Sequence, residues 1–138
     1  MILDNSPELL DALSIYLEME SFDVSTEVSH ELFKIKLKTF IPDIVLLDVF
    51  IRQLDGREIC RELKGDTESS HLPVLLMSAD PRALKNYQEC FADGAIDKPF
   101  DLPELLRQIK FLTHSRIVNF DMRSVLLPSQ PGLGQISV

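Results

Sequence analysis

Five polar residues directly follow apolar stretches of this sequence. Asp4 and Asn5 follow the first three residues, and Asp48 follows a run of valine, isoleucine and leucine. Ser78 ends a second apolar run, and Lys98 follows a short third stretch. If these stretches are neighbouring parallel strands, their carboxyl ends meet at one edge of the sheet. Two carboxylates, an amide, a hydroxyl and an ammonium group would then converge there.

This set of side chains suits phosphoryl transfer. Neighbouring carboxylates repel each other and favour a proton or a cation, and Mg²⁺ binds through one or two carboxylates together with phosphate and water. Because the cation would neutralise an incoming phosphoryl group, the Asp48 carboxylate could attack phosphorus. Lys98 would balance charge on the phosphoryl oxygens, and Ser78 would donate a hydrogen bond to one of them. An aspartyl phosphate would result.

Each of these residues also has an ordinary structural interpretation. Taken alone, Asp4 is more often a helix-capping acid, and Ser78 is usually a small residue at a strand end. A lone lysine such as Lys98 is most often a solvated surface charge, and Asp48 is as often a simple loop acid. Their shared position at one predicted sheet edge favours the functional interpretation for all of them.

The segments that would position these residues alternate between short apolar stretches and amphipathic ones. Residues 43–49 and 73–79 are apolar without polar alternation, which is typical of strands covered on both faces. Alternating strands and helices predict an α/β fold: a doubly wound, five-stranded parallel sheet with helices on both faces and right-handed crossovers. The predicted strands are 1–3, 22–28, 43–49, 73–79 and 95–98, and the predicted helices are 6–20, 29–40, 55–64, 80–91 and 101–115.

Size and composition exclude several classes of protein. A chain of 138 residues with 45% hydrophobic and 26% charged residues suits one globular domain. Its net charge of -8 argues against a nucleic-acid partner. No apolar run is long enough to span a membrane, and the first residues lack the pattern of a signal peptide. Cys60 and Cys90 are isolated, as in buried thiols of a reducing compartment, so we expect a cytoplasmic location.

Four segments, in order, resemble the receiver domain of two-component response regulators over roughly residues 1–115. They are LDNSPELL (3–10), PDIVLLD (42–48) with LDG (54–56) after it, PVLLMSA (73–79) and DKPF (97–100). The resemblance implies a flavodoxin-like fold with strand order 2-1-3-4-5. Four motifs in the family's order, each at a predicted strand end, are much more specific than any one of them.

The resemblance also implies a role for each candidate residue. Asp48 corresponds to the phosphoacceptor, while Asp4 and Asn5 occupy the positions of the acidic pair that binds Mg²⁺ with Asp48. Ser78 corresponds to the switch hydroxyl and Lys98 to its charge partner. The backbone carbonyl of Phe50 would be a further Mg²⁺ ligand, and the Lys98–Pro99 bond would be cis.

Two positions depart from the family pattern. Asn5 replaces the second acid, which removes a negative charge and predicts weaker Mg²⁺ binding. Ala95 lies where the family commonly has a switching tyrosine or phenylalanine. Without a ring at this position, Ser78 cannot be coupled to an aromatic rotamer, and the signal must travel differently.

The resemblance predicts a phosphorelay switch. The chain would accept a phosphoryl group on Asp48 from a histidine kinase or a phosphotransfer protein, and would then change its surface for a downstream protein partner. It would modify only itself, so we do not expect an enzyme with external substrates. The alternatives are a phosphotransfer intermediate and an interaction module that works without phosphorylation.

Two further classes are disfavoured. An aspartate-nucleophile phosphatase would typically have D-x-D where this chain has Asp48 followed by Val49 and Phe50. A nucleotide or flavin protein would have a glycine-rich turn after its first strand, and no G-x-G-x-x-G occurs here.

Residues 116–138 contain prolines and glycines without a clear period, so we predict a receiver domain at 1–115 and a C-terminal tail at 116–138. The tail is more apolar than a free linker needs. It would cover the signalling face, bridge to a second copy in a homodimer, or extend the domain's own core. The apolar residues in question are Ile117, Val118, Phe120, Val125, Leu126 and Leu127.

Overall fold

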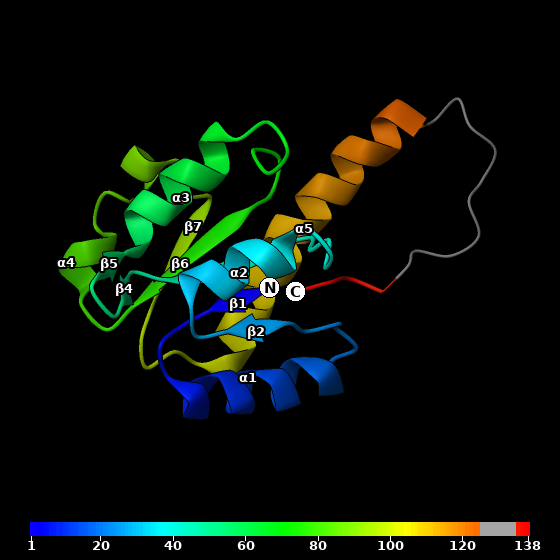
Figure 1. Cartoon of the computed structure of the whole chain (residues 1–138). Coiled ribbons are helices and arrows are strands. Elements are labelled where there is room, and N and C mark those ends of the chain that lie inside the picture. The colour runs from blue at the N-terminus through cyan, green and yellow to red at the C-terminus, as the bar shows by residue number, and fades with distance from the viewer. Residues whose placement is uncertain (125–134) are drawn as a thin grey trace.

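The computed structural model describes residues 1–124 and 135–138, with side chains described for 1–114 and 135–138. A five-stranded parallel sheet lies between two layers of helices (Figure 1). The strand order is β2-β1-β3-β6-β7, which is the predicted order 2-1-3-4-5 for the strands of this sheet. These strands are β1 (Ile2–Leu3), β2 (Thr26–Glu27), β3 (Val45–Asp48), β6 (Val74–Ser78) and β7 (Gly94–Asp97).

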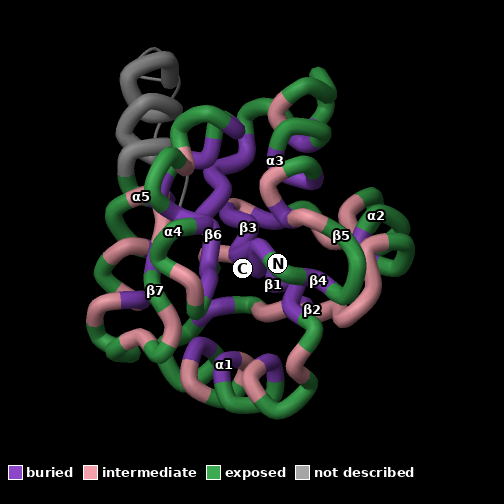
Figure 2. Tube along the Cα trace, turned by 90° about the vertical axis from the view of Figure 1, so that its left-hand side faces the viewer, coloured by how far each residue is buried: buried purple, intermediate pink, exposed green. Residues whose placement is uncertain are grey.

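The helices cover the two faces of the sheet and enclose two separate cores. One core contains residues of α1 and α5, and the other contains residues of α2, α3 and α4. Buried residues concentrate on the strands between these layers (Figure 2). The helices are α1 (Pro7–Met19), α2 (His30–Leu37), α3 (Gly56–Gly65), α4 (Pro81–Leu84) and α5 (Leu102–Ser124), with a 3₁₀ helix η1 (Tyr87–Cys90) before β7.

The apolar runs of β3 and β6 are buried because side chains of a strand alternate between its two faces. On β3, Leu46 points into the core beside α1 and α5, while Val45 and Leu47 point into the core beside α2, α3 and α4. Each fully buried side chain of this size contributes about 1.5 to 3 kcal/mol. Both faces of the central strands therefore hold the sheet in place.

Side-chain caps fix where the helices begin. Ser6 accepts a hydrogen bond from the Leu9 amide at the start of α1, with Pro7 in the first turn as predicted. Asp55 caps α3 in the same way. Each cap starts its helix directly after the loop at the carboxyl edge of the sheet.

Several predicted boundaries were wrong. The second strand is confined to two residues, and a small antiparallel hairpin of β4 (Phe50–Ile51) and β5 (Leu54–Asp55) was not predicted. The helix predicted to reach residue 91 ends at Leu84 and gives way to η1. The last helix, predicted to end at 115, continues to Ser124.

The end of the predicted tail lies against the sheet. Ser137 forms a parallel bridge with Asp23, and Val138 is fully buried in the core beside α1 and α5. Of the three interpretations of the tail, extension of the core describes residues 136–138. The other apolar tail residues, 117–127, lie outside the residues whose side chains are described.

Within the described part of the chain, no helix combines the length and the apolar character that a membrane span requires. The Lys98–Pro99 peptide bond is cis, as the family resemblance implies.

Candidate functional site

Three of the predicted site residues meet at the carboxyl edge of the sheet. The Lys98 Nζ atom lies 2.5 Å from Asp4 Oδ2 and 3.5 Å from Asp48 Oδ1. Asp4 follows β1, Asp48 ends β3 and Lys98 follows β7. Asp4 is fully buried and Asp48 is 5% exposed. Two carboxylates far apart in sequence therefore share one ammonium group in a largely water-free position.

The single Lys98 ammonium does not fully compensate the negative charge of the buried Asp48 carboxylate. Burial raises the pKa of the Asp48 carboxyl, and the negative charge of Asp4 raises it further. The Lys98 ammonium acts in the opposite direction, as does the Phe50 amide, which donates to Asp48 Oδ1 at 3.4 Å. Because the raising effects prevail, this carboxylate favours a proton or a cation.

We expect Asp48→Asn to stabilise the metal-free protein at neutral pH. A raised pKa in the folded state means that the ionised Asp48 costs stability above that pKa, and that the cost disappears as the pH falls toward the ordinary value of 3.8. Replacing a largely buried carboxylate by an amide should therefore add about 1 kcal/mol near pH 7. Urea unfolding without divalent cations should show this gain, and the gain should shrink in acid.

The matched control for this prediction is Asp11→Asn, which changes an exposed carboxylate on α1. It should leave the free energy of unfolding within about 0.5 kcal/mol. An Asp48→Asn variant that is less stable than the parent at neutral pH would contradict the electrostatic argument.

Ser78 ends β6 opposite Asp97, the residue before Lys98, and Asn5 directly follows Asp4, but both differ from the cluster in their environment. Ser78 is fully buried, and its hydroxyl accepts a hydrogen bond from the Asp80 amide at 3.0 Å. The Ser78 carbonyl accepts from the Lys98 amide at 2.8 Å, which joins the ends of β6 and β7. Asn5, beside the buried Asp4, is exposed to solvent.

The donor set fits Mg²⁺ by chemical type. Mg²⁺ binds proteins through one or two carboxylates and keeps several waters or phosphate oxygens. Asp4 and Asp48 supply two carboxylates, and Asn5 adds an amide oxygen from the next residue. Among the described residues, no group of three or more acidic, histidine or cysteine side chains is placed to hold a metal. A weakly held, largely hydrated cation suits this set better than a fully enclosed one.

Gly56 supports the site in a way that the sequence reasoning did not assign. A Cβ atom on Gly56 would lie 2.0 Å from the Asp48 carbonyl oxygen and 2.9 Å from the Val49 Cα atom. The Gly56 amide donates to the Val49 carbonyl at 2.6 Å. The available signal was the Asp–Gly pair of the LDG segment, because glycine is favoured where two backbones approach closely.

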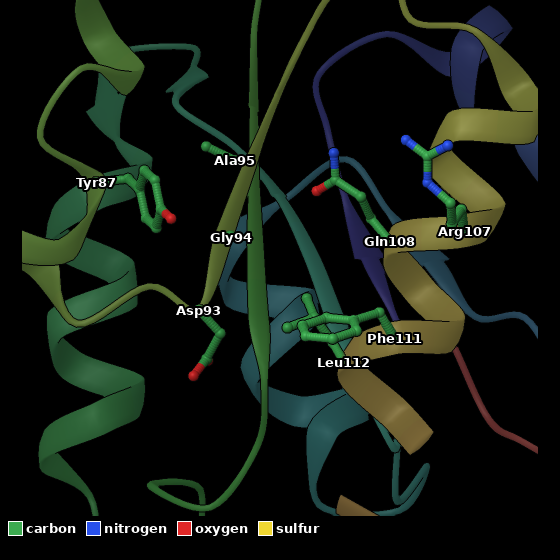
Figure 3. A pocket seen from close by; sticks show the side chains of 8 residues that line it. All are labelled: Tyr87, Asp93, Gly94, Ala95, Arg107, Gln108, Phe111 and Leu112. Atoms are coloured by element: carbon green, nitrogen blue, oxygen red, sulfur yellow. The ribbon is translucent and has the colours of Figure 1, made fainter. Parts of the chain in front are cut away.

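A pocket lies beside β7, between η1 and α5, and Ala95, where the family resemblance leads us to expect an aromatic ring, is one of its lining residues. Figure 3 shows Tyr87 on the same side of β7 as the Ala95 methyl group, with Gln108 and Phe111 of α5 on the other side. Tyr87 and Ala95 pack against the same core. The aromatic ring on this side of β7 therefore belongs to η1 and not to the strand itself.

The sequence matches a family model and curated relatives. The model of the response regulator receiver domain matches residues 1–110. The DNA-binding dual master transcriptional regulator RpaA of Synechocystis sp. is 31% identical over 114 residues, covering 81% of this chain and 47% of the relative. The heme response regulator HssR of Staphylococcus epidermidis is 34% identical over 124 residues, covering 88% and 54%. The chain thus spans about half the length of these relatives.

Solved structures agree with the sequence comparison. The signal receiver domain of a signal transduction histidine kinase from Syntrophus aciditrophicus has a TM-score of 0.74 and 27% identity, covering 96% of each chain. The response regulator TrrA from Thermotoga maritima, solved in complex with Mg(2+)-BeF, shares the fold with a TM-score of 0.71, 22% identity, and coverage of 80% and 95%. The chain belongs to the response regulator receiver domain family, as its motifs predict.

Proposed function

We propose that this receiver domain accepts a phosphoryl group on Asp48 from the phosphohistidine of a histidine kinase or a phosphotransfer protein. The observation that carries the proposal is the pair of buried carboxylates, Asp4 and Asp48, that share the partly exposed Lys98 ammonium at the carboxyl edge of the sheet. It combines a nucleophilic carboxylate with a fixed positive charge at the position where ligands bind in this type of fold.

In the proposed reaction, an oxygen of the ionised Asp48 forms a bond to phosphorus while the nitrogen–phosphorus bond of the donor histidine breaks. The electron pair of that bond remains on the imidazole nitrogen. The product on this chain is an aspartyl phosphate, and the Lys98 ammonium lies close enough to neutralise a phosphoryl oxygen. The chain modifies itself and turns over no external substrate.

Mg²⁺ is the proposed cofactor, with Asp4, Asn5, Asp48 and the Phe50 carbonyl as its protein ligands. When bound, it supplies the positive charge that lets an anionic phosphoryl group approach anionic carboxylates. The Mg(2+)-BeF complex of TrrA supports this choice of cation.

The signal would begin at Ser78. Its hydroxyl accepts from the Asp80 amide, one residue before α4 begins. A phosphoryl group on Asp48 would draw this hydroxyl toward itself, weaken the Ser78–Asp80 contact and shift the start of α4. The surface of α4, β7 and α5 would then bind a downstream protein differently.

A second function has specific support. Asn5 is exposed and uncharged, and Ala95 removes the usual aromatic switch, which together favour an interaction module that works without phosphorylation. The buried Asp4 and Asp48, with Lys98 against both, favour the phosphorylated switch instead. A phosphotransfer intermediate would use the same site. Transfer of the phosphoryl group from Asp48 to a histidine phosphotransfer protein would identify it.

Intact mass spectrometry tests the proposal. The protein is incubated with Mg²⁺ and a small-molecule phosphodonor, beside Asp48→Asn and the exposed control Asp101→Asn. We expect one phosphoryl adduct on the parent and on Asp101→Asn, and none on Asp48→Asn. No adduct should form on the parent when a chelator is present from the start. No adduct on the parent at saturating Mg²⁺ would reject the proposal and favour the phosphorylation-independent module.

Restoring the missing acid should strengthen Mg²⁺ binding. Asn5→Asp adds a negative charge beside the proposed cation, and a unit charge about 4 Å away is worth on the order of 1 to 4 kcal/mol. We expect a decrease in Kd of about tenfold, measured by calorimetric titration with Mg²⁺. The control Asn86→Asp adds the same charge at an exposed position near η1 and should leave Kd unchanged. Equal affinities for parent and Asn5→Asp would exclude Asn5 as a ligand position.

A further inference from the structure

Residues 136–138 form a hydrogen-bonded ladder with the segment that leads into β2. The Asp23 amide donates to the Ile136 carbonyl at 3.1 Å, and the Val138 amide donates to the Asp23 carbonyl at 2.6 Å. The Ser25 amide then donates to the Val138 carbonyl at 2.9 Å. This is the alternating pattern of a parallel strand pair, in which every second residue of one strand bonds to both neighbours of its partner.

The ladder continues into β1 without a change of register. The Ile2 amide donates to the Ser25 carbonyl at 2.8 Å, so the amide of Ser25 bonds to Val138 and its carbonyl bonds to Ile2 along the same edge. Ser137 pairs with Asp23, and Leu3 pairs with Glu27. Met1 therefore takes the place opposite Ser25 that a residue directly after Val138 would take. Along β2, residues 136–138 and 1–3 occupy consecutive positions of one strand.

The neighbouring strand makes similar contacts on the other side. The Asp43 amide donates to the Ser137 carbonyl at 2.7 Å, and the Asp43 carboxylate accepts from the Ser137 amide at 2.7 Å. The Met1 nitrogen donates to the Ile44 carbonyl at 2.8 Å, and the Met1 carbonyl accepts from the Leu46 amide at 2.9 Å. Residues 136–138 therefore lie between the segments that lead into β2 and β3.

Side chains reinforce this placement. Val138 is fully buried, and Ile136 packs partly buried against the same core. Ile2 of β1 and Leu13 and Leu17 of α1 belong to that core as well. The pattern of two apolar side chains separated by a small polar one is what a strand with one face on this core requires.

We propose that the amino-terminal end of the β1 position is a strand-docking site, and that its occupant is the chain's own C-terminal segment, residues 136–138, bound within the same molecule. Figure 1 shows the two ends of the chain side by side at this position. The ten residues between Ser124 and Gln135 make eleven Cα–Cα steps, which reach at most about 40 Å when fully extended, longer than a small domain is wide. The site is distinct from the phosphorylation site and does not depend on it.

Hydrogen exchange measured by NMR on the full chain tests the docking site. Val138→Asp places a charge in the buried position, and Gln135→Asp places the same charge at an exposed position one residue before the segment. We expect at least tenfold faster exchange of the Asp23 and Ser25 amides in Val138→Asp, with the Leu47 and Leu76 amides unchanged. Gln135→Asp should match the parent. Unchanged protection of Asp23 and Ser25 in Val138→Asp would overturn the proposal.

A milder variant covers the case in which Val138→Asp does not fold. Val138→Ala keeps an apolar side chain but fills less of the core, and it should accelerate exchange at Ser25 by a few fold without affecting Leu76. Equal exchange at Ser25 in Val138→Ala and the parent would count against docking of this segment. Light scattering and hydrogen exchange across a dilution series distinguish docking within one molecule from docking between two copies. A monomer whose Ser25 amide keeps the same protection at every concentration supports docking within one molecule. A dimer whose Ser25 amide loses protection on dilution overturns it.

Discussion

Replacing Gly56 by alanine should lower the free energy of unfolding by about 3 kcal/mol or more. The new Cβ would lie 2.0 Å from the Asp48 carbonyl oxygen and 2.9 Å from two further backbone atoms of Asp48 and Val49. Backbone cannot rotate away as a flexible side chain can, so either α3 or the end of β3 must shift. Overpacking of this kind usually costs about 1 to 3 kcal/mol and more where backbone is involved.

Gly65→Ala is the matched control, because nothing lies within 4 Å of a Cβ at that position, at the end of the same helix. It should change stability by less than about 1 kcal/mol. Urea unfolding of the two variants gives the comparison. Gly56→Ala should also reduce phosphoryl uptake, since the clash involves the backbone of Asp48 itself. Equal stabilities of the two variants would mean that α3 does not approach β3 as closely as described.

Replacing Lys98 by methionine should cost about 2 to 3 kcal/mol at neutral pH in the absence of Mg²⁺. The variant keeps two buried carboxylates, Asp4 and Asp48, without the ammonium that lies against both. Removing one partner of a buried ion pair leaves uncompensated charge, which is costly. Because Lys98 is partly exposed, we expect a cost below the roughly 3 to 5 kcal/mol of a fully buried pair.

The pH dependence gives this loss a distinctive signature. Lys98 lowers the pKa of Asp48, so its removal raises that pKa further. The deficit should be largest above the raised pKa and should shrink as the pH falls through it, because a protonated Asp48 no longer needs a counter-charge. Added Mg²⁺ should restore part of the stability. Thermal unfolding across pH, with the exposed Lys110→Met as control, measures both effects. A deficit independent of pH and Mg²⁺ would indicate lost packing instead.

The strands that carry the site could be predicted because their sequences are unambiguous. The runs of β3 and β6 have no polar alternation and can only be buried on both faces. Parallel strands in this order must bring Asp4, Asp48 and Lys98 to the same edge, and in the structure the Lys98 ammonium lies against both carboxylates. The exposure of Asn5 and the contact between Ser78 and Asp80 depend on side-chain orientation, which residue spacing does not specify.

The wrong boundaries have local physical causes. The strands β4 and β5 have two residues each, too few to show a period. The predicted helix from 80 to 91 keeps helical spacing of its apolar residues, but Asn86 leaves the helical region with φ -122 and ψ 49. Phe91 adopts a positive φ of 67, which ends η1 before β7. Neither backbone change has a marker such as glycine or proline at the position concerned.

The docking of residues 136–138 sets an order in which the domain can fold. The contact between Ser137 and Asp43 spans 94 residues, and the entropic cost of closing a loop grows with the logarithm of its length. Once α5 has packed, the open segment falls to the ten residues between Ser124 and Gln135. By the same relation, closure then costs about 2 kcal/mol less. The first strand of the sheet should therefore be the last to be completed, and a refolding experiment should show Ser25 protected after Leu76.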